Sequence, residues 1–364
     1  MKVLQVIDNF SKTSGIANAI LNYYYLMDKN IVQFDFLVVT YDSSIKEKVE
    51  SMGAQVFTMS KLGLTNLALF KNEIEAFFCK HGNEYAAVHS NFYQIDFILF
   101  SVAKRYGIKT CISHCHNTRY ADYFLRSLRN FVLSRLGRMC ATDYVACSEN
   151  AGKFMFGKRK KVYILNNAIE CCKYAYNETI RNELRTKLDL DDKFVVGHVG
   201  RFNKQKNHKF LFEVFKKYKA QHENAVLLLV GGGELMPQIK AYASRLGIEN
   251  DVIYMGVQND VASILQAMDC FVFPSYYEGL GIALIEAQAS GLPCVASSVI
   301  PKETKVTDLI TYLPLGDSAK WADCINDKMP IERTDTSSDI IRNGYDLRTN
   351  ICALTDYYAG LLTK

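Results

Sequence analysis

The sequence lacks the features that mark several large classes of protein. It contains no run of eighteen apolar residues, so no helix is expected to span a membrane. The first residues, MKVLQVIDNF, enter an apolar strand pattern directly, without the apolar region and small-residue cleavage site of a signal peptide. No short-period repeat and no low-complexity tract is found, so neither a repeat architecture nor a biased segment is indicated.

Paired cysteines and a strong net charge are also missing. The eleven cysteines include no C-x-x-C pair, and their odd number argues against a full disulfide framework. Free thiols in a reducing cytosol are therefore expected. The formal net charge of +5 fits an anionic ligand or an anionic membrane surface, but it is too small to indicate nucleic acid. We expect a cytoplasmic protein, peripheral to the inner face of the membrane.

Two series of short β-rich runs alternate with helix-length segments along the 364 residues. This pattern predicts βαβ units, parallel sheets and an α/β fold of two Rossmann-like, doubly wound domains. A charged break at Asn177–Lys193 separates the two series. The predicted strands are Val3–Ile7, Phe34–Thr40, Gln55–Met59, Ala86–His89, Thr110–His114, Tyr144–Cys147, Val162–Leu165, Phe194–Val199, Ala225–Val230, Val252–Tyr254, Cys270–Phe273 and Cys294–Ser297.

The second series of strands and helices begins after about residue 170, which is the best candidate for a domain boundary. We expect a first domain over 1–170, a second over 171–345, and a C-terminal helix over 346–364 that packs back on the first domain. Ligands of open α/β sheets bind at the carboxyl ends of the strands, so the loops that follow strands are where function is sought.

Two cations follow the first strand of the second domain. The strand FVVGHVG runs into RFNKQKN, where Arg201 and Lys206 suit a diphosphate, although a solvated charged loop has the same composition. The next strand ends in GGGE, Gly231–Glu234, which either brings backbone N–H groups to a ligand or makes only a tight turn. No G-x-G-x-x-G follows the first strand of the chain, so a nicotinamide cofactor is not supported.

Two glutamates lie in a segment that otherwise reads as buried, YYEGLGIALIEAQASGLP. Carboxylates are rarely buried unless paired or hydrogen-bonded. A helix is predicted over Ile282–Ala289, which puts Glu278 in the preceding loop and Glu286 inside the helix. The amides of Gly279 and Gly281 then lie near the helix N-terminus, where anions bind. The alternative is a helix cap plus one ion-paired glutamate.

In the first domain, polar residues follow two predicted strands. Gly15, in the loop before the first helix, can bring backbone close to a phosphate. TCISHCHNTRY ends another strand with His114 and His116 beside Cys111 and Cys115. Alternation along a strand turns the cysteines and histidines to opposite faces, and no zinc-type spacing is present, so no metal is expected. A histidine at the strand end is instead a candidate contact to a substrate.

The segment Arg119–Arg138, RYADYFLRSLRNFVLSRLGR, predicts a basic amphipathic helix. Two interpretations stay open. The helix lies on an anionic membrane surface, or its apolar side packs on its own domain and its arginines face water. Both hold if the helix packs inward and turns its arginines toward lipid headgroups. The apolar residues at helical spacing are Phe124, Leu125, Leu128, Phe131, Val132 and Leu136.

Taken in order, these motifs resemble the retaining glycosyltransferases of family 4, which have the GT-B fold of two such domains facing a central cleft. E-x7-E is specific when it follows FVFPS and precedes A-x-A-x-G-x-P, as it does here. SHCHN and NNAIE look like the branch that builds bacterial capsular and exopolysaccharides. The matching pieces are the loop at Gly15, SHCHN, SEN at Ser148–Asn150, NNAIE at Asn166–Glu170, VGRFNKQKN, GGGE, and Glu278–Glu286.

The resemblance implies transfer of a hexose or N-acetylhexosamine from a nucleotide-diphospho-sugar, a UDP-sugar in this branch, to a lipid-linked saccharide in surface polysaccharide biosynthesis. Arg201 and Lys206 would neutralise the diphosphate, Glu278 would contact the sugar, and His116 would contact it from the first domain. No cofactor or metal is implied. The donor-binding positions implied are Gly15, His114 (the alternative to His116), Val257 at the base, Gly279, Leu280, Gly281, Ile282, and Glu286 at the ribose.

Two positions depart from the family pattern. Ser14–Gly15 stands where the family often has Gly-Gly, and Asn167–Ala168 where it usually has Asn-Gly. Two alternatives to a transferase remain: a nucleotide-sugar epimerase or hydrolase on the same fold, and a non-catalytic nucleotide-sugar-binding protein at a membrane. The first should carry further acid/base carboxylates, which we do not identify. The intact Glu278, Glu286, Arg201 and Lys206 argue against the second.

Overall fold

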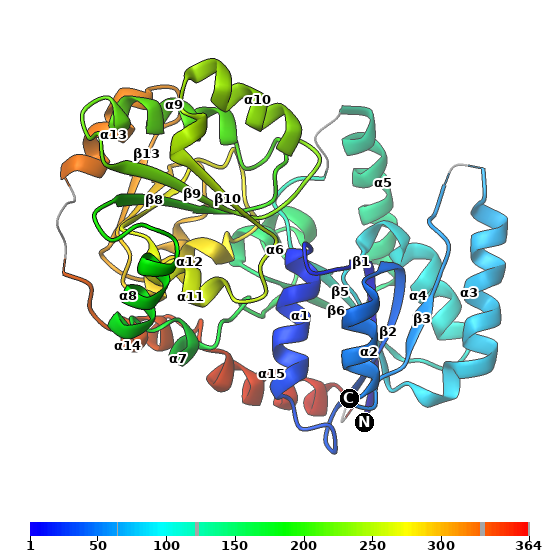
Figure 1. Ribbon diagram of the computed structural model, residues 1–364. Coiled ribbons are helices and arrows are strands. Elements are labelled where there is room, and N and C mark those ends of the chain that lie inside the picture. The colour runs from blue at the N-terminus through cyan, green and yellow to red at the C-terminus, as the bar shows by residue number, and fades with distance from the viewer. Residues whose placement is uncertain (64, 121–123, 328–331, 363–364) are drawn as a thin grey trace. The chain divides into compact units, whose positions relative to one another are not determined.

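The computed structural model describes residues 1–63, 65–120, 124–327 and 332–362. The chain forms two compact units (Figure 1). The first comprises Met1–Ala168 together with Leu347–Lys364, and the second comprises Ile169–Asp346. Each unit contains a parallel sheet with helices on both faces, so the predicted pair of doubly wound domains is confirmed.

The first unit is built on a seven-stranded parallel sheet in the order β3-β2-β1-β4-β5-β6-β7. The order reverses between β1 and β4, which makes this the switch point of the sheet. The strands are β1 (Lys2–Phe10), β2 (Gln33–Tyr41), β3 (Val56–Thr58), β4 (Ala87–Ser90), β5 (Thr110–Cys115), β6 (Asp143–Ala146) and β7 (Tyr163–Ile164). The helices are α1 (Gly15–Leu26), α2 (Ser43–Glu50), α3 (Leu67–His81), η1 (Gly82–Glu84), η2 (Tyr93–Ile95), α4 (Asp96–Arg105), α5 (Phe124–Cys140), α6 (Glu149–Phe156) and α15 (Leu347–Leu362).

The last helix, α15, belongs to the first unit. Leu347, Leu354, Tyr358 and Leu361 are buried in the core cluster that also holds the inward side of α1. The phenol ring of Tyr358 lies edge-on to Phe34 of β2, with ring centroids 5.8 Å apart. A helix from the end of the chain therefore completes the core of the domain at its beginning.

The second unit is built on a six-stranded parallel sheet in the order β10-β9-β8-β11-β12-β13, with its switch point between β8 and β11. The strands are β8 (Phe194–Val199), β9 (Ala225–Val230), β10 (Val252–Gly256), β11 (Cys270–Phe273), β12 (Cys294–Ser297) and β13 (Ile310–Leu313). The helices are α7 (Cys171–Tyr174), α8 (Glu178–Lys187), α9 (His208–Lys219), α10 (Met236–Leu246), η3 (Glu249–Asp251), α11 (Val261–Ala267), α12 (Ile282–Ala289), η4 (Lys302–Thr304), α13 (Ser318–Asp327) and α14 (Ser337–Arg342).

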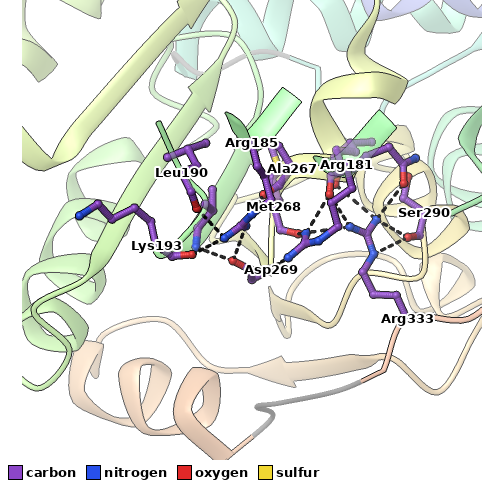
Figure 2. A network of polar contacts seen from close by, with 12 residues as sticks. Arg181, Arg185, Leu190, Lys193, Ala267, Met268, Asp269, Ser290 and Arg333 are labelled. Carbon is purple, nitrogen blue, oxygen red and sulfur yellow. Dashed lines mark hydrogen bonds and ion pairs between the residues drawn. The ribbon is translucent and has the colours of Figure 1, made fainter. Parts of the chain in front are cut away.

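A network of buried charges lies at the amino edge of this second sheet (Figure 2). Asp269, just before β11, accepts from Arg181 and from Arg185, whose Nη1 lies 3.0 Å from Asp269 Oδ2. The same oxygen accepts the backbone N–H of Val195 in β8 at 2.8 Å. One carboxylate thus ties helix α8 to two adjacent strands.

Arg333 extends the network along the chain (Figure 2). Its Nη1 donates to the carbonyl oxygen of Gln266 at 2.7 Å, and its Nε donates to that of Ser290 at 2.9 Å. These carbonyls lie at the ends of α11 and α12, where backbone acceptors lack helical partners. Burial, with repulsion from Arg181 adding to it, lowers the pKa of Arg333 to about 9, so the guanidinium stays charged at neutral pH.

Candidate active site

An ion pair bridges the switch point of the second sheet. Lys206 follows β8 and Glu278 follows β11, and Lys206 Nζ lies 2.7 Å from Glu278 Oε1. Glu278 is only 7% exposed. Because the carboxyl ends of adjacent parallel strands meet at one edge, two residues 72 positions apart come into contact where α/β sheets bind ligands.

Neighbouring side chains hold this pair in place. Gln205 Nε2 donates to Glu278 Oε2 at 3.0 Å and to the carbonyl oxygen of Tyr277 at 2.9 Å. The Lys206 ammonium also lies over the Phe273 ring, 4.4 Å from its centroid. Both carboxylate oxygens of Glu278 therefore accept a hydrogen bond, which explains why this carboxylate can be buried.

The second glutamate has a different partner. Glu286 Oε1 accepts the hydroxyl of Tyr174, from α7, at 2.8 Å. Burial raises the pKa of Glu286, and the Tyr174 hydrogen bond and the charges of Lys173 and Lys206 oppose that rise. Burial also raises the pKa of Tyr174, so the phenol keeps its proton and remains a donor. The bond orients Glu286 on the helix.

The helix α12 that carries Glu286 begins without a side-chain cap. Its N-cap, Gly281, has φ of 93°, which favours glycine, and a Cβ there would lie 3.3 Å from the Phe273 ring. The first N–H groups of a helix have no acceptor within the helix, so the amides around Leu280–Ile282 suit an anion. The predicted helix bounds, Ile282–Ala289, are confirmed.

The triple glycine packs backbone against backbone. A Cβ at Gly231 would lie 2.1 Å from the carbonyl oxygen of Gly200, and one at Gly233 would lie 2.6 Å from that of Phe202. Close approach of backbone to backbone therefore explains Gly231 and Gly233, and both interpretations of GGGE remain predictions.

Two more predicted residues lie at this same edge of the second sheet. Arg201, directly after β8, is exposed and its Nη2 lies 3.2 Å from Glu234 Oε2. Val257, directly after β10, is 48% exposed. The edge thus brings together the predicted diphosphate cations, both glutamates and the residue predicted to lie near the base.

In the first unit, Gly15 begins helix α1 behind Ser14, whose side chain accepts the N–H of Ala17. A Cβ at Gly15 would meet no atom within 4 Å. Close packing within the protein therefore does not require glycine at this position. Only a ligand that approaches the backbone would require it, as the predicted phosphate contact does.

Three neighbouring histidines lie in or directly after strands of the first sheet, and a hydrogen bond joins two of them, His89 and His114. Tyr358, from α15, has its hydroxyl 2.7 Å from His89 Nδ1, and His89 Nε2 lies 3.1 Å from His114 Nδ1. His116 Nε2 lies 2.9 Å from Asn91 Oδ1, and the rings of His114 and His116 are 3.9 Å apart. We call this set, with Gln5, the histidine chain.

Amide geometry sets the direction of every bond in the histidine chain. Asn91 Nδ2 lies 3.5 Å from the His89 carbonyl and 3.0 Å from Gln5 Oε1, so this end of the amide is the NH₂ group. Gln5 Nε2 then donates to the Tyr358 hydroxyl at 3.0 Å, which leaves that hydroxyl to donate to His89. Each histidine in turn carries its hydrogen on Nε2.

The two remaining ring nitrogens have opposite character. His114 Nε2 is then a donor and His116 Nδ1 an acceptor, and neither has a partner among the described residues. Burial lowers the pKa of His89 and of His116 to about 3, so the rings are neutral at physiological pH. His114 is 3% exposed inside the strand, whereas His116 at the strand end is partly exposed.

The histidine chain predicts one tautomer for all three rings. Nitrogen-15 NMR of histidine-labelled protein should show hydrogen on Nε2 of His89, His114 and His116. In Tyr358→Phe, only the His89 ring loses its fixed partner, so its signals should shift most. Hydrogen on Nδ1 of any of the three rings in the unaltered protein would contradict the assigned direction of the hydrogen bonds. In Tyr358→Phe, a loss of packing alone would leave the tautomers of the three rings unchanged.

Cysteines near these histidines point away from them. Cys111 belongs to the core on one face of the sheet and Ile112 to the core on the other, as strand alternation predicts. All eleven cysteines are free. Among the described residues, no group of three or more His, Cys, Asp and Glu side chains could hold a metal ion.

Helix α5 packs with an unexpected side. Its buried residues are Asn130, Ser134 and Gly137, and a Cβ at Gly137 would lie 2.7 Å from Asp96 Cβ. Large apolar side chains of this helix face outward. The interpretation that the predicted apolar side packs on its own domain is wrong for five of its six residues, because the small residues do so instead, and Leu136 is half-buried. The exposed apolar residues are Phe124 (81%), Leu125 (78%), Leu128 (52%), Phe131 (38%), Val132 (49%) and Met139 (80%).

Of the predicted helix Arg119–Arg138, residues 121–123 lie outside the described part of the chain. Within the described residues, no helix is both long enough and apolar enough to cross a membrane.

Comparison with known proteins identifies the family. Residues 180–311 match the family model described as glycosyl transferases group 1. The chain is 32% identical over 371 residues to the putative glycosyltransferase EpsF of Bacillus subtilis, with 98% of this chain and 96% of that protein covered. The chain belongs to this glycosyltransferase family.

A second sequence relative and a solved structure are also similar to this glycosyltransferase. It is 27% identical over 303 residues to the Escherichia coli UDP-Gal:alpha-D-GlcNAc-diphosphoundecaprenol alpha-1,3-galactosyltransferase, covering 79% of this chain and 76% of that one. Anabaena HepE, solved with UDP and glucose, superimposes with a TM-score of 0.81 at 20% identity, covering 99% and 100% of the two chains. The predicted GT-B fold and the prediction of an enzyme are confirmed.

Several residues that orient the candidate site residues of each unit were not predicted. Gln205 and Tyr174 orient the two glutamates, and neither lies in a motif with a recognisable spacing. Gln5, His89 and Tyr358 order the histidine chain from three distant segments. The polar Gln5 and His89 within apolar strands were the available signal, since such residues need a partner when buried.

Proposed function

We propose that this glycosyltransferase moves a hexose or N-acetylhexosamine from a UDP-sugar to a lipid-linked saccharide acceptor, with retention of configuration. The observation that carries the proposal is the buried Lys206–Glu278 pair at the switch point of the second sheet. An ammonium held there can bind a diphosphate, and the carboxylate beside it can accept hydrogen bonds from sugar hydroxyls.

Departure of the diphosphate is the step these groups would assist. As the bond between the sugar and the diphosphate breaks, negative charge grows on the leaving oxygen and positive charge on the sugar ring. Lys206, Arg201 and the amides around Leu280–Ile282 would stabilise the former in a site of low dielectric. The buried Lys206 and the exposed Arg201 would together do for the diphosphate what a metal ion does elsewhere, so we propose that transfer needs no metal.

Retention would follow from a front-face reaction. Glu278 has one oxygen on Lys206 and the other on Gln205, so neither is directed as a nucleophile. The leaving phosphate oxygen would accept the proton of the acceptor hydroxyl on the face it leaves, and the new bond would form there. Glu286 would bind the ribose, and His116 would contact the sugar from the first unit.

The relatives support the choice of substrates. The Escherichia coli relative is named for UDP-galactose and a diphosphoundecaprenol-linked acceptor, and a Staphylococcus aureus relative is named for capsular polysaccharide biosynthesis. A sugar-nucleotide donor and a lipid-linked acceptor suit a cytoplasmic enzyme of surface polysaccharide synthesis that is peripheral to the membrane.

Helix α5 is the proposed membrane contact. Its exposed residues Phe124, Leu125, Leu128 and Val132 would enter the boundary between lipid headgroups and acyl chains. In co-sedimentation with phosphatidylglycerol vesicles, Leu128→Ser/Val132→Ser should lower the bound fraction, because apolar area that is buried in the bilayer drives partition. A double change of Leu67→Ser/Leu69→Ser, exposed residues on α3, is the matched control and should change nothing.

The reaction itself can be tested with a donor panel. Purified protein with lipid-linked acceptors and EDTA should release UDP from one UDP-sugar, and mass spectrometry should show an acceptor heavier by that sugar. NMR should show the anomeric configuration of the donor in the product. Glu278→Ala should lower kcat strongly while the protein stays folded.

Other outcomes favour the alternatives. Conversion of the nucleotide sugar without acceptor would indicate an epimerase or hydrolase. Donor binding without turnover across the whole panel, unchanged in Glu278→Ala, would indicate a non-catalytic binding protein. Activity that EDTA removes and Mg²⁺ restores would contradict the proposed metal independence.

A further inference from the structure

Tyr174, the partner of Glu286, comes from the start of the second unit. It is the last residue of α7, the first helix after the chain passes into this unit at Ile169. Its ring packs on the core cluster that contains Leu265 of α11 and Leu284 of α12, and its hydroxyl donates to Glu286 Oε1 at 2.8 Å. A phenylalanine would pack in the same way, so packing does not account for the hydroxyl.

The backbone around Tyr174 is fixed on both sides. Before α7, the N–H of Ile169 donates to the carbonyl oxygen of Tyr345 at 2.9 Å. After it, Gln266 of α11, which is 1% exposed, donates from Nε2 to the carbonyl oxygen of Tyr174 at 3.2 Å. Gln266 Oε1 also accepts the N–H of Asn177 at 3.2 Å. These bonds set the direction in which Tyr174 presents its hydroxyl.

The bond with Tyr174 leaves one oxygen of Glu286 available. Glu286 Oε2 has no hydrogen-bond partner among the described residues, and the side chain is partly exposed. Burial raises the pKa of Glu286, and the Tyr174 bond opposes that rise more than the charges of Lys173 and Lys206 do. The phenol therefore favours the ionised carboxylate, which accepts hydrogen bonds and does not donate them.

An acceptor of this kind suits a ligand that carries hydroxyl groups. We propose that Tyr174 is a positioning residue for the ribose of the donor nucleotide and acts through Glu286. This inference rests on the proposed ribose contact of Glu286 and adds a second residue to it. Because Tyr174 fixes the rotation of the carboxylate, Oε2 is in place before the nucleotide binds, and binding does not have to order it.

The decisive variant is Tyr174→Phe, which keeps the packed ring and removes only the hydroxyl. In calorimetric titration with UDP and no acceptor, its Kd should be about tenfold higher than that of the unaltered protein, as expected for a hydrogen bond to a charged group. The matched control is Tyr242→Phe, because Tyr242 on α10 donates to Glu213 on α9 at the same 2.8 Å. Its Kd for UDP should not change. The ribose is common to nucleoside diphosphates, so GDP or ADP carries the same test if UDP does not bind.

A second nucleotide separates positioning from a general loss of structure. The analogue of UDP that lacks both ribose hydroxyls should bind the unaltered protein more weakly than UDP, because Glu286 then has no hydroxyl to accept. In Tyr174→Phe, the ratio of the two Kd values should shrink by at least about threefold, since the two groups are coupled through one carboxylate. In Glu286→Ala, adding Tyr174→Phe should leave the Kd for UDP unchanged.

The remaining outcomes overturn the inference. An unchanged Kd for UDP in Tyr174→Phe would show that the hydroxyl positions nothing, and a lower Kd would show that it competes with the ligand for Glu286. An equal loss for both nucleotides would give Tyr174 a structural role only. If the unaltered protein binds UDP and the analogue equally, the proposed ribose contact itself fails. Binding is measured without turnover, so absence of sugar transfer leaves this test standing.

Discussion

Replacing Lys206 with methionine should lower kcat by about 10²- to 10³-fold, the cost of removing one preorganised group that stabilises transition-state charge. Methionine keeps much of the aliphatic length over the Phe273 ring but removes the ammonium. The change also leaves the buried Glu278 without its ion-pair partner. The loss therefore has two possible physical sources, the diphosphate and the glutamate.

A second variant separates these sources. In Lys206→Met/Glu278→Gln the glutamate no longer needs a cation. If Lys206 served only to neutralise Glu278, the double variant would recover activity toward that of Glu278→Gln alone. If Lys206 stabilises the leaving diphosphate, the double variant should be slower than Glu278→Gln. Steady-state kinetics with UDP release as the readout distinguishes the two.

Lys204 supplies the matched control for this loop. It lies two residues away, is exposed, and has no ion pair among the described residues. Lys204→Met should keep kcat within about twofold, since exposed surface charges contribute little. A Lys206→Met enzyme as active as Lys204→Met would contradict the proposed role of the buried pair.

The sequence predicts strands well where they are apolar and bounded by turn residues. All twelve predicted strands exist, and those at Phe194–Val199, Ala225–Val230, Cys270–Phe273 and Cys294–Ser297 have the predicted bounds. The strand that was missed, β13, covers only Ile310–Leu313, and three of its four residues are partly exposed. A short edge strand lacks the continuous apolar run that marks a buried one.

The site was predictable as far as its residues follow strands. Lys206 and Glu278 both do, so the parallel order of the sheet was enough to place them at one edge. Their direct contact depends on β8 and β11 being neighbours, which residue patterns alone do not determine. Tyr358 shows the same limit more strongly, because its contact with His89 spans 269 positions.

Helix α5 shows where periodicity misleads. Its spacing of apolar residues correctly predicts a helix, but a hydrophobic pattern cannot tell which side meets the protein. Here the contact with α4 is so close that only small residues fit, as Gly137 against Asp96 demonstrates. Close packing, and not apolarity, decided which side is buried.

Asp269→Ala should lower the free energy of unfolding of the second unit by about 3 to 5 kcal/mol, the usual cost of removing one partner from a buried ion pair. Its carboxylate is 10% exposed and is the acidic partner of both Arg181 and Arg185. Alanine leaves two guanidinium groups without a counter-charge and the Val195 N–H without its acceptor.

Trp321 makes the measurement specific to the second unit. It is the only tryptophan of the chain and is fully buried in the core beside β8 and β9. Its fluorescence during urea unfolding therefore reports this unit alone. Asp192→Ala is the control, since that residue is 74% exposed and its Oδ2 lies 3.7 Å from Lys193 Nζ. Surface pairs of this kind contribute at most about 1 kcal/mol.

The position of Asp269 also predicts what should not change. It lies at the amino edge of the second sheet, whereas Lys206 and Glu278 lie at the carboxyl edge. Below its unfolding transition, Asp269→Ala should therefore keep a kcat near that of the unaltered enzyme. A folded Asp269→Ala protein with normal stability would contradict the assigned role of the network. A loss of kcat in the folded Asp269→Ala protein would instead show that β8 and β11 transmit a structural change from one edge of the sheet to the other.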